Sequence, residues 1–147
     1  MATRSIIAKL DEKGVEAIYC HSDGYLEHTG KILDQHYQDE EKVDELLAQG
    51  DASIIDENIG EKIKFNDFKS RITNKQCVFY ARDRGEKPSS RQPITLEDDI
   101  ALLEFAEKAC DAQYVYLYAF GYWYVYCMAE DTQFAELDDV LSKVFYE

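Results

Sequence analysis

YVYLYAFGYWYVYC, residues 114–127, is the stretch that decides the fold. Tyrosine and apolar side chains alternate on both sides of a break at 119–121, and this pattern predicts a β-hairpin spanning 113–128. Two registers are open. A two-residue loop would pair Tyr118 with Trp123 and distribute tyrosines over both faces, whereas a three-residue loop with Gly121 in the left-handed conformation would pair Tyr118 with Tyr122. We expect the second register, because it places six tyrosines on one face.

This tyrosine face has a structural and a functional interpretation. Cross-strand aromatic pairs stabilise a sheet by about 0.2–1 kcal/mol each, so a tyrosine ladder covered by a helix would belong to the core. An uncovered ladder would instead be an aromatic platform for a partner protein or a ring-bearing ligand. The candidate partner-binding residues on this face are Tyr116, Tyr118, Tyr122 and Tyr124.

The rest of the chain predicts an α+β fold in which an antiparallel sheet packs with about four helices. Alternating stretches at 5–10 and 15–21 predict an N-terminal hairpin, and 77–81 predicts a further strand. Helical patterns occur at 28–37, after the N-cap Asp39, after Thr95, and from Asp131 or Thr132 onward. Residues 51–75 and 82–92 lack a period and predict loops. A chain of 147 residues suits one core, so we expect a single domain, 1–147.

The net charge of −14 is distributed unevenly along the chain. Residues 34–61 hold ten acids against the single base Lys42, and residues 97–147 hold twelve acids against two lysines. Between these segments, residues 62–96 hold nine bases against three acids. Because a strongly acidic body repels phosphates at long range, direct binding to DNA or RNA is disfavoured.

The acidic charge is either solubilising or a surface that imitates the phosphate array recognised by a nucleic-acid-binding enzyme. Under the second interpretation, the acids at the start of the helix after residue 38 are the first candidates for contact with a partner protein. These candidate partner-binding residues are Asp39, Glu40, Glu41, Asp44 and Glu45.

No sequence motif for phosphate binding, zinc proteolysis, serine hydrolysis or calcium binding occurs in the chain. The sequence therefore names no catalytic residue and favours a protein that is not an enzyme. The densest titratable cluster lies at 19–25, and a small polar pocket would form if the loop at 82–86 folded against it. The candidate ligand-binding residues of that pocket are His21, Asp23, His36, Arg82 and Arg84. The histidine spacing matches no zinc site, and we expect neither a metal nor a cofactor.

The four cysteines have no paired spacing, which favours buried free thiols over a disulfide framework. The N-terminus lacks the basic and apolar regions of a signal peptide, and no apolar stretch approaches the ~18 residues that a membrane-spanning helix needs. We therefore expect a cytoplasmic protein that does not contact a membrane.

Two distinctive runs occur in the first 86 residues. The first is Tyr19-Cys20-His21-x-Asp23-Gly24-Tyr25, followed by Gly30-Lys31-Ile32-Leu33 and His36-Tyr37, and the second is Tyr80-x-Arg82-Asp83-Arg84-Gly85-Glu86. Together they resemble a family of small, mostly uncharacterised proteins from tailed bacteriophages and prophages. The chain differs from that family in having Ser22 where tryptophan is frequent and Thr29 where asparagine is frequent. The resemblance implies a phage origin and the host-cell cytoplasm as the location, but no activity.

Three functional hypotheses follow. The leading one is a non-enzymatic acidic phage protein that binds a host protein, as an anti-defence inhibitor or a nucleic-acid mimic. It rests on the resemblance, because small acidic phage proteins often bind and block host enzymes. The alternative is a small-ligand or nucleotide-binding protein, or an enzyme, that uses the pocket named above. The third is an accessory phage protein that forms a homo-oligomer through the tyrosine face.

Overall fold

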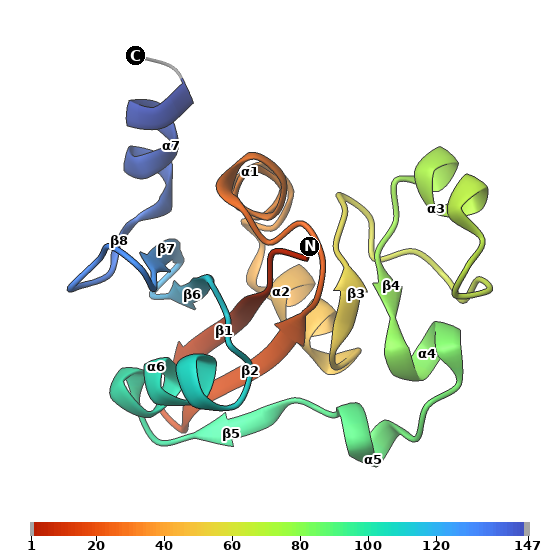
Figure 1. Cartoon of the computed structure of the whole chain (residues 1–147), viewed down its shortest axis with the longest axis horizontal. Coiled ribbons are helices and arrows are strands. Elements are labelled where there is room, and N and C mark those ends of the chain that lie inside the picture. Colours follow the sequence, from red (N-terminus) through yellow and green to blue (C-terminus); the bar gives the residue numbers. More distant parts are fainter. Residues whose placement is uncertain (1, 146–147) are drawn as a thin grey trace.

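A mixed sheet of eight strands runs through residues 2–145, the part of the chain that the computed structural model describes (Figure 1). Helices pack on both faces of this sheet, which confirms the predicted α+β class. The strands are β1 Ser5–Asp11, β2 Gly14–Cys20, β3 Ala52–Ile54, β4 Val78–Phe79, β5 Ile94–Leu96, β6 Tyr114–Ala119, β7 Tyr122–Cys127 and β8 Ala135–Glu136. The helices are the π-helical turn η1 Leu26–Gly30, α1 Lys31–His36, α2 Glu40–Ala48, α3 Phe68–Asn74, α4 Tyr80–Arg84, α5 Pro88–Arg91, α6 Asp99–Lys108 and α7 Leu137–Phe145.

The strand order is β4-β3-β2-β1-β6-β7-β8, with β5 paired to β2 beside this path. Most neighbouring strands are antiparallel, as predicted, but β1 pairs with β6 and β2 with β3 in parallel. Because β1 occupies one edge of β2, β5 and β3 must share the other edge. Val15 to Ala17 pair with β5, and Cys20 pairs with β3. The backbone of Tyr19 therefore lies in a gap between two partner strands.

The two faces of the sheet carry different helices. On one face, α1, α2 and α7 pack against a core that includes Ile7 and Tyr116. On the other face, α6 packs Leu102 and Ala106 against a core that includes Ile6. As a result, α2 and α6, which are both rich in acids, lie on opposite sides of the sheet.

The tyrosine hairpin has the register that we did not expect. Tyr118 pairs with Trp123 and Ala119 pairs with Tyr122, which leaves a two-residue loop of Phe120 and Gly121. Both loop residues have positive φ angles, 55° and 86°, as in a type I′ turn, whose twist matches that of the flanking strands. The predicted pairing of Tyr118 with Tyr122 is therefore wrong, and the six tyrosines do not share one face.

Tertiary hydrogen bonds explain why the β6 tyrosines lie on the face of α1 and α2. The hydroxyl of Tyr116 donates to the carbonyl of Gly24 at 2.6 Å, and that of Tyr118 donates to the carbonyl of Gln38 at 3.0 Å. The indole of Trp123 makes a similar bond to a carbonyl at the end of α1. Because buried hydroxyl groups need partners, the carbonyls of the segment after β2 favour this face for β6.

Short-range signals in the first half of the chain are confirmed. β1 and β2 form the N-terminal hairpin, and η1 with α1 occupies most of the segment predicted as helical at 28–37. The carboxylate of Asp39 accepts a hydrogen bond from the backbone N–H of Glu41 at 3.2 Å and so caps α2 as predicted.

Several element boundaries differ from the prediction. Residues 80–81 begin α4 instead of ending a strand at 77–81, and the predicted loops contain β3, α3, α4 and α5. Asp98 caps α6 through the N–H of Ala101 at 2.9 Å, whereas Thr95 belongs to β5. The last helix begins at Leu137, after the short strand β8.

Candidate functional site

The first motif, residues 19–25, builds the turn that follows β2. Asp23 has a positive φ of 55°, and its carbonyl accepts hydrogen bonds from the N–H and the hydroxyl of Thr29. Gly24 is packed so closely that an added Cβ would lie 2.6 Å from the side chain of Ser5. The hydroxyl of Tyr19 and Nδ1 of His21 are joined by a 2.7 Å hydrogen bond. Most of this motif therefore stabilises the backbone of the turn, and the side chains of Tyr19 and His21 are hydrogen-bonded to each other.

The second motif contains a buried clamp. The carboxylate of Asp83 accepts hydrogen bonds from the backbone N–H groups of Ile63 and Phe79 at 3.0 and 2.8 Å, and from Arg82 at 3.0 Å. The guanidinium of Arg82 also donates to three carbonyls, those of Ile59, Gly60 and Cys77. Arg82 and Asp83 thus hold the loop before α3 against β4 and α4.

The five candidate ligand-binding residues do not form the predicted pocket. His36 lies 3.4 Å from Glu57, Arg82 is used by the clamp, and Arg84 is exposed beside Glu86 at 3.6 Å. Five surface pockets lie among the described residues, and Asp23 is the one candidate ligand-binding residue that lines any of them. These pockets therefore do not bring His21, Asp23, His36, Arg82 and Arg84 together, and four of the five side chains have separate local partners.

The histidines also have separate partners. Nε2 of His28 is hydrogen-bonded to the carbonyl of Ile55 at 2.8 Å, whereas His21 is hydrogen-bonded to Tyr19. Within the part of the chain that is described, the group with metal-ligand spacing is a set of three exposed carboxylates: Glu136, Asp138 and Asp139.

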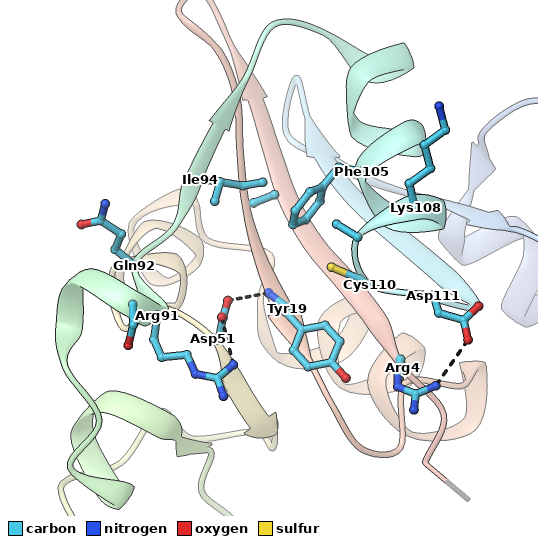
Figure 2. Close-up of a pocket in the computed structure, with 13 residues that line it drawn as sticks. Arg4, Tyr19, Asp51, Arg91, Gln92, Ile94, Phe105, Lys108, Cys110 and Asp111 are labelled. Carbon is cyan, nitrogen blue, oxygen red and sulfur yellow. Dashed lines mark hydrogen bonds and ion pairs between the residues drawn. The ribbon is translucent and has the colours of Figure 1, made fainter.

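A pocket lies instead on the open edge of β2, lined by one residue of the first motif and adjacent to the second (Figure 2). Its volume is about 580 Å³, within the range of roughly 300–1,000 Å³ that is usual for ligand sites. Tyr19 of the first motif lines it. Arg91 also lines it and stacks on the ring of Tyr80, from the second motif, at 4.1 Å. We call this the β2-edge pocket, and its main lining residues are Arg4, Tyr19, Asp51, Arg91, Phe105 and Cys110.

The polar wall of the β2-edge pocket is organised around Asp51. One of its oxygens accepts the N–H of Tyr19 at 2.9 Å, taking the place of a strand partner. The other lies 3.5 Å from Nη1 of Arg91, whose Nε donates to Glu86 at 2.9 Å. Burial raises the pKa of Asp51, although the hydrogen bonds from Tyr19 and Arg91 oppose this shift. On the other side of Tyr19, the guanidinium of Arg4 forms an ion pair with the carboxylate of Asp111 at 3.6 Å (Figure 2).

The opposite wall is apolar and comes from three elements. Ala17 of β2, Ile94 of β5 and Phe105 of α6 line it, and Lys108 of α6 lies at its rim. The pocket exists because β5 leaves β2 after Ala17, whereas β3 joins β2 only at Cys20. Its members are therefore brought together by strand pairing between distant segments.

Cys110 in this pocket gives a pH-dependent prediction. Burial, together with the charge of Asp51, raises the pKa of the Cys110 thiol to about 11. Because only the thiolate reacts, alkylation of Cys110 by iodoacetamide should accelerate about tenfold per pH unit between pH 7 and 10. Peptide mass spectrometry of timed samples measures the rate. A rate that levels off below pH 9 would contradict the stated environment of the thiol.

α2 presents a strip of acids to solvent. All five candidate acids, Asp39, Glu40, Glu41, Asp44 and Glu45, are exposed. Lys42 is directed away from the strip, since its ammonium donates to two backbone carbonyls at 2.7 Å. Lys9 contacts Glu40 and Asp44 at 2.9 and 2.8 Å. One lysine against five carboxylates leaves this strip negative.

The two acidic segments of the sequence approach each other at one place. The pKa of Asp34 in α1 is raised by burial and then by the negative charge of Asp138 in α7. The acids of α6 lie on the other face of the sheet. Acids of both segments therefore occur on the side of α1, α2 and α7, and a separate group of acids lies along α6.

The tip of the tyrosine hairpin combines exposure with backbone strain. The side chain of Phe120 is 84% exposed although its φ is 55°, a conformation that costs a bulky residue about 1–2 kcal/mol. Asparagine or glycine is usual at this turn position. The tip borders a hollow of about 450 Å³ that three acids, Asp11, Glu12 and Glu40, and one base, Lys9, also line. We call Phe120 with these three acids the acidic tip.

Of the two interpretations of the tyrosines, the uncovered aromatic platform does not form. Tyr116 and Tyr118 are buried, and Tyr124 is half-buried against the α6 side. Tyr122 is 62% exposed and neighbours Phe120 at the end of β7. Since the β6 tyrosines are covered, neither partner binding nor self-association can use the face that we predicted.

Comparisons of the chain with protein-family models, curated proteins and solved structures find no match. The resemblance to phage proteins therefore stays a prediction. No helix among residues 2–145 has the length and apolar character needed to cross a membrane.

Phe120, Asp51 and Arg91 are absent from the candidates derived from the sequence. Phe120 had a visible signal, because an aromatic residue before glycine in a hairpin loop replaces the usual asparagine or aspartate. Asp51 and Arg91 had none, since their meeting depends on which strands share the edge of β2.

Proposed function

We propose that this protein is a non-enzymatic binding protein whose acidic tip and α2 strip engage the basic surface of a partner protein. The proposal rests on the exposure of the Phe120 side chain at a backbone position with a positive φ angle. A strained backbone position filled by a fully presented apolar side chain reduces stability, and such outliers concentrate at functional sites. Phe120 would enter an apolar recess on the partner, as aromatic residues do at the centres of protein interfaces.

The surroundings of Phe120 define the chemistry of the partner. Asp11, Glu12 and Glu40 border the hollow beside it and outnumber Lys9, which also lines it and pairs with Glu40; the α2 acids continue from Glu40. An aromatic group rimmed by carboxylates complements a recess rimmed by lysine and arginine. Basic surfaces of this kind are typical of nucleic-acid-binding proteins, so the partner's own nucleic acid should compete with this chain.

The resemblance to phage proteins supports a host enzyme as the partner and the host cytoplasm as the place of binding. The protein would then inhibit a defence or DNA-processing enzyme by occupying its nucleic-acid-binding surface. The residues named for the small-ligand alternative do not line one common pocket, and Tyr116 and Tyr118 of the self-association alternative are buried, so the exposed acidic tip supports partner binding best.

The experiment compares three baits in bacterial lysate. The first is the wild type, the second replaces four α2 acids (E40Q, E41Q, D44N, E45Q), and the third replaces four exposed acids around α6 (E97Q, D99N, E104Q, E107Q). The second and third carry the same charge change on opposite faces of the sheet. We expect a discrete protein that the wild type and the α6 variant retain, that the α2 variant loses, and that double-stranded DNA or RNA displaces. Equal loss with both variants, or retention by all three baits, would contradict the proposal.

Phe120→Asn separates binding from folding. Asparagine suits the left-handed turn position, so this variant should raise the free energy of unfolding by about 1 kcal/mol and the Tm by about 2–4 °C. Thermal unfolding followed by circular dichroism measures the shift, with Tyr122→Asn as a control outside the turn. A lower Tm for Phe120→Asn would mean that the phenyl ring contributes to the fold, which the proposal excludes.

A further inference from the structure

The β2-edge pocket lies away from the acidic tip, and its lining contains more bases than acids. In a chain with 30 acids and 16 bases, three of the bases, Arg4, Arg91 and Lys108, line this one pocket. The acids that line it are Asp51 and Asp111. A cation-rich hollow in an acidic protein provides local contacts for an anion that the rest of the surface repels.

Of the two arginines of the pocket, Arg4 is held more loosely by its present partner. Arg4 is 3.6 Å from a carboxylate of Asp111 that is itself 94% exposed, whereas Arg91 is 3.5 Å from Asp51 and also donates through Nε to Glu86 at 2.9 Å. By comparison, Lys9 contacts its acids at 2.8–2.9 Å. Long, solvated ion pairs contribute little to stability, so the Arg4 guanidinium can exchange Asp111 for a ligand oxygen at small cost.

The pocket also offers flat apolar contacts. Phe105 and Ile94 form one wall, and the ring of Tyr19 lies between Arg4 and Arg91 (Figure 2). Interaction between Tyr19 and Arg4 is evident in the pKa of Tyr19, which burial raises and the Arg4 charge lowers. Aromatic walls with a few charged groups at the rim are the usual composition of sites for ring-bearing ligands.

From these features, we propose that the β2-edge pocket binds a small anionic ligand with an aromatic ring, of mononucleotide size. The ring lies against Phe105 and Ile94. The phosphate lies over the ring of Tyr19 and is bound by Arg4 and Arg91, whose planar guanidinium groups can each donate two hydrogen bonds to a pair of phosphate oxygens. This site is independent of partner binding at the acidic tip, because different elements build the two surfaces.

The direct test is titration of the full chain with AMP, GMP, CMP and UMP, followed by calorimetry and by nuclear magnetic resonance. We expect at least one mononucleotide to bind with a submillimolar dissociation constant, and more tightly than its nucleoside or inorganic phosphate. It should also protect Cys110 from alkylation, with Cys127, which lies outside the pocket, as the internal control. No binding by any of the four, or equal binding of phosphate alone, would overturn the proposal.

A matched pair of variants locates the binding. Arg4→Gln removes a pocket arginine, and Arg84→Gln removes an exposed arginine outside it with the same 3.6 Å ion-pair length. Arg4→Gln should weaken nucleotide binding about tenfold, whereas Arg84→Gln should leave it unchanged. Equal effects of the two variants would show a general response to charge and would count against the pocket. The α2 variant should bind the nucleotide normally, so failure here and failure of partner binding are distinguishable.

Discussion

Asp83→Ala is expected to destabilise the protein by about 3–5 kcal/mol, because it removes one partner of a buried ion pair. The Asp83 side chain is fully buried and accepts hydrogen bonds from the backbone of Ile63 and Phe79 as well as from Arg82. Without it, the Arg82 charge and two backbone N–H groups lose their acceptor. Urea unfolding followed by circular dichroism measures the free energy of unfolding.

Asp98→Ala is the control for this prediction. Asp98 also accepts a backbone N–H, that of Ala101 at 2.9 Å, but it is an exposed helix cap. Its loss should cost about 1 kcal/mol, as is usual for a cap. If Asp83→Ala costs no more than Asp98→Ala, the second motif does not clamp the loop before α3 in the way described.

Gly50→Ala is expected to have the second large effect. Gly50 has a φ of 81°, and an added Cβ would lie 2.3 Å from the carbonyl oxygen of Arg91. The left-handed backbone costs about 1–2 kcal/mol, and the overpacking against a backbone atom adds about 1–3 kcal/mol. The displaced segment carries Asp51 and Arg91, so the β2-edge pocket should change shape with it. Denaturant unfolding and the alkylation rate of Cys110 report the two effects.

Gly85→Ala is a matched control for Gly50→Ala. Gly85 has the same φ of 81°, but a Cβ there would meet nothing within 4 Å. It should therefore show the conformational cost alone and leave the Cys110 rate unchanged. Equal losses of stability in the two variants would contradict the close packing of Gly50 against Arg91.

The parts of the fold that were predictable from sequence are those with short-range causes. Asp39 caps α2 through a neighbour two residues away, and the N-terminal hairpin follows from alternation around a glycine turn. The predicted register of the tyrosine hairpin was wrong because placing all six tyrosines on one face is not what determines the register. The Tyr116 and Tyr118 hydroxyls bond to carbonyls 92 and 80 residues away, which no local pattern contains.

The same distinction applies to the sites. The exposed acids of α2 follow from helical spacing, so their position on the surface was predictable. The ligand pocket was not, since it depends on β3 and β5 sharing one edge of β2 and on Asp51 filling the gap at Tyr19. Histidine and arginine chemistry suggested the grouping of His21 with Arg82, but Arg82 is instead hydrogen-bonded to the carboxylate of Asp83.

The central claim is that Phe120 and the surrounding acids bind a basic partner. Its most direct test is the dissociation constant of the purified partner for the wild type and for Phe120→Asn, measured by calorimetry alongside the Tm of each. The account predicts binding weakened about 30-fold or more, as for an interface hot spot, in a variant that is more stable than the wild type. Unchanged affinity in the stabilised variant would contradict it.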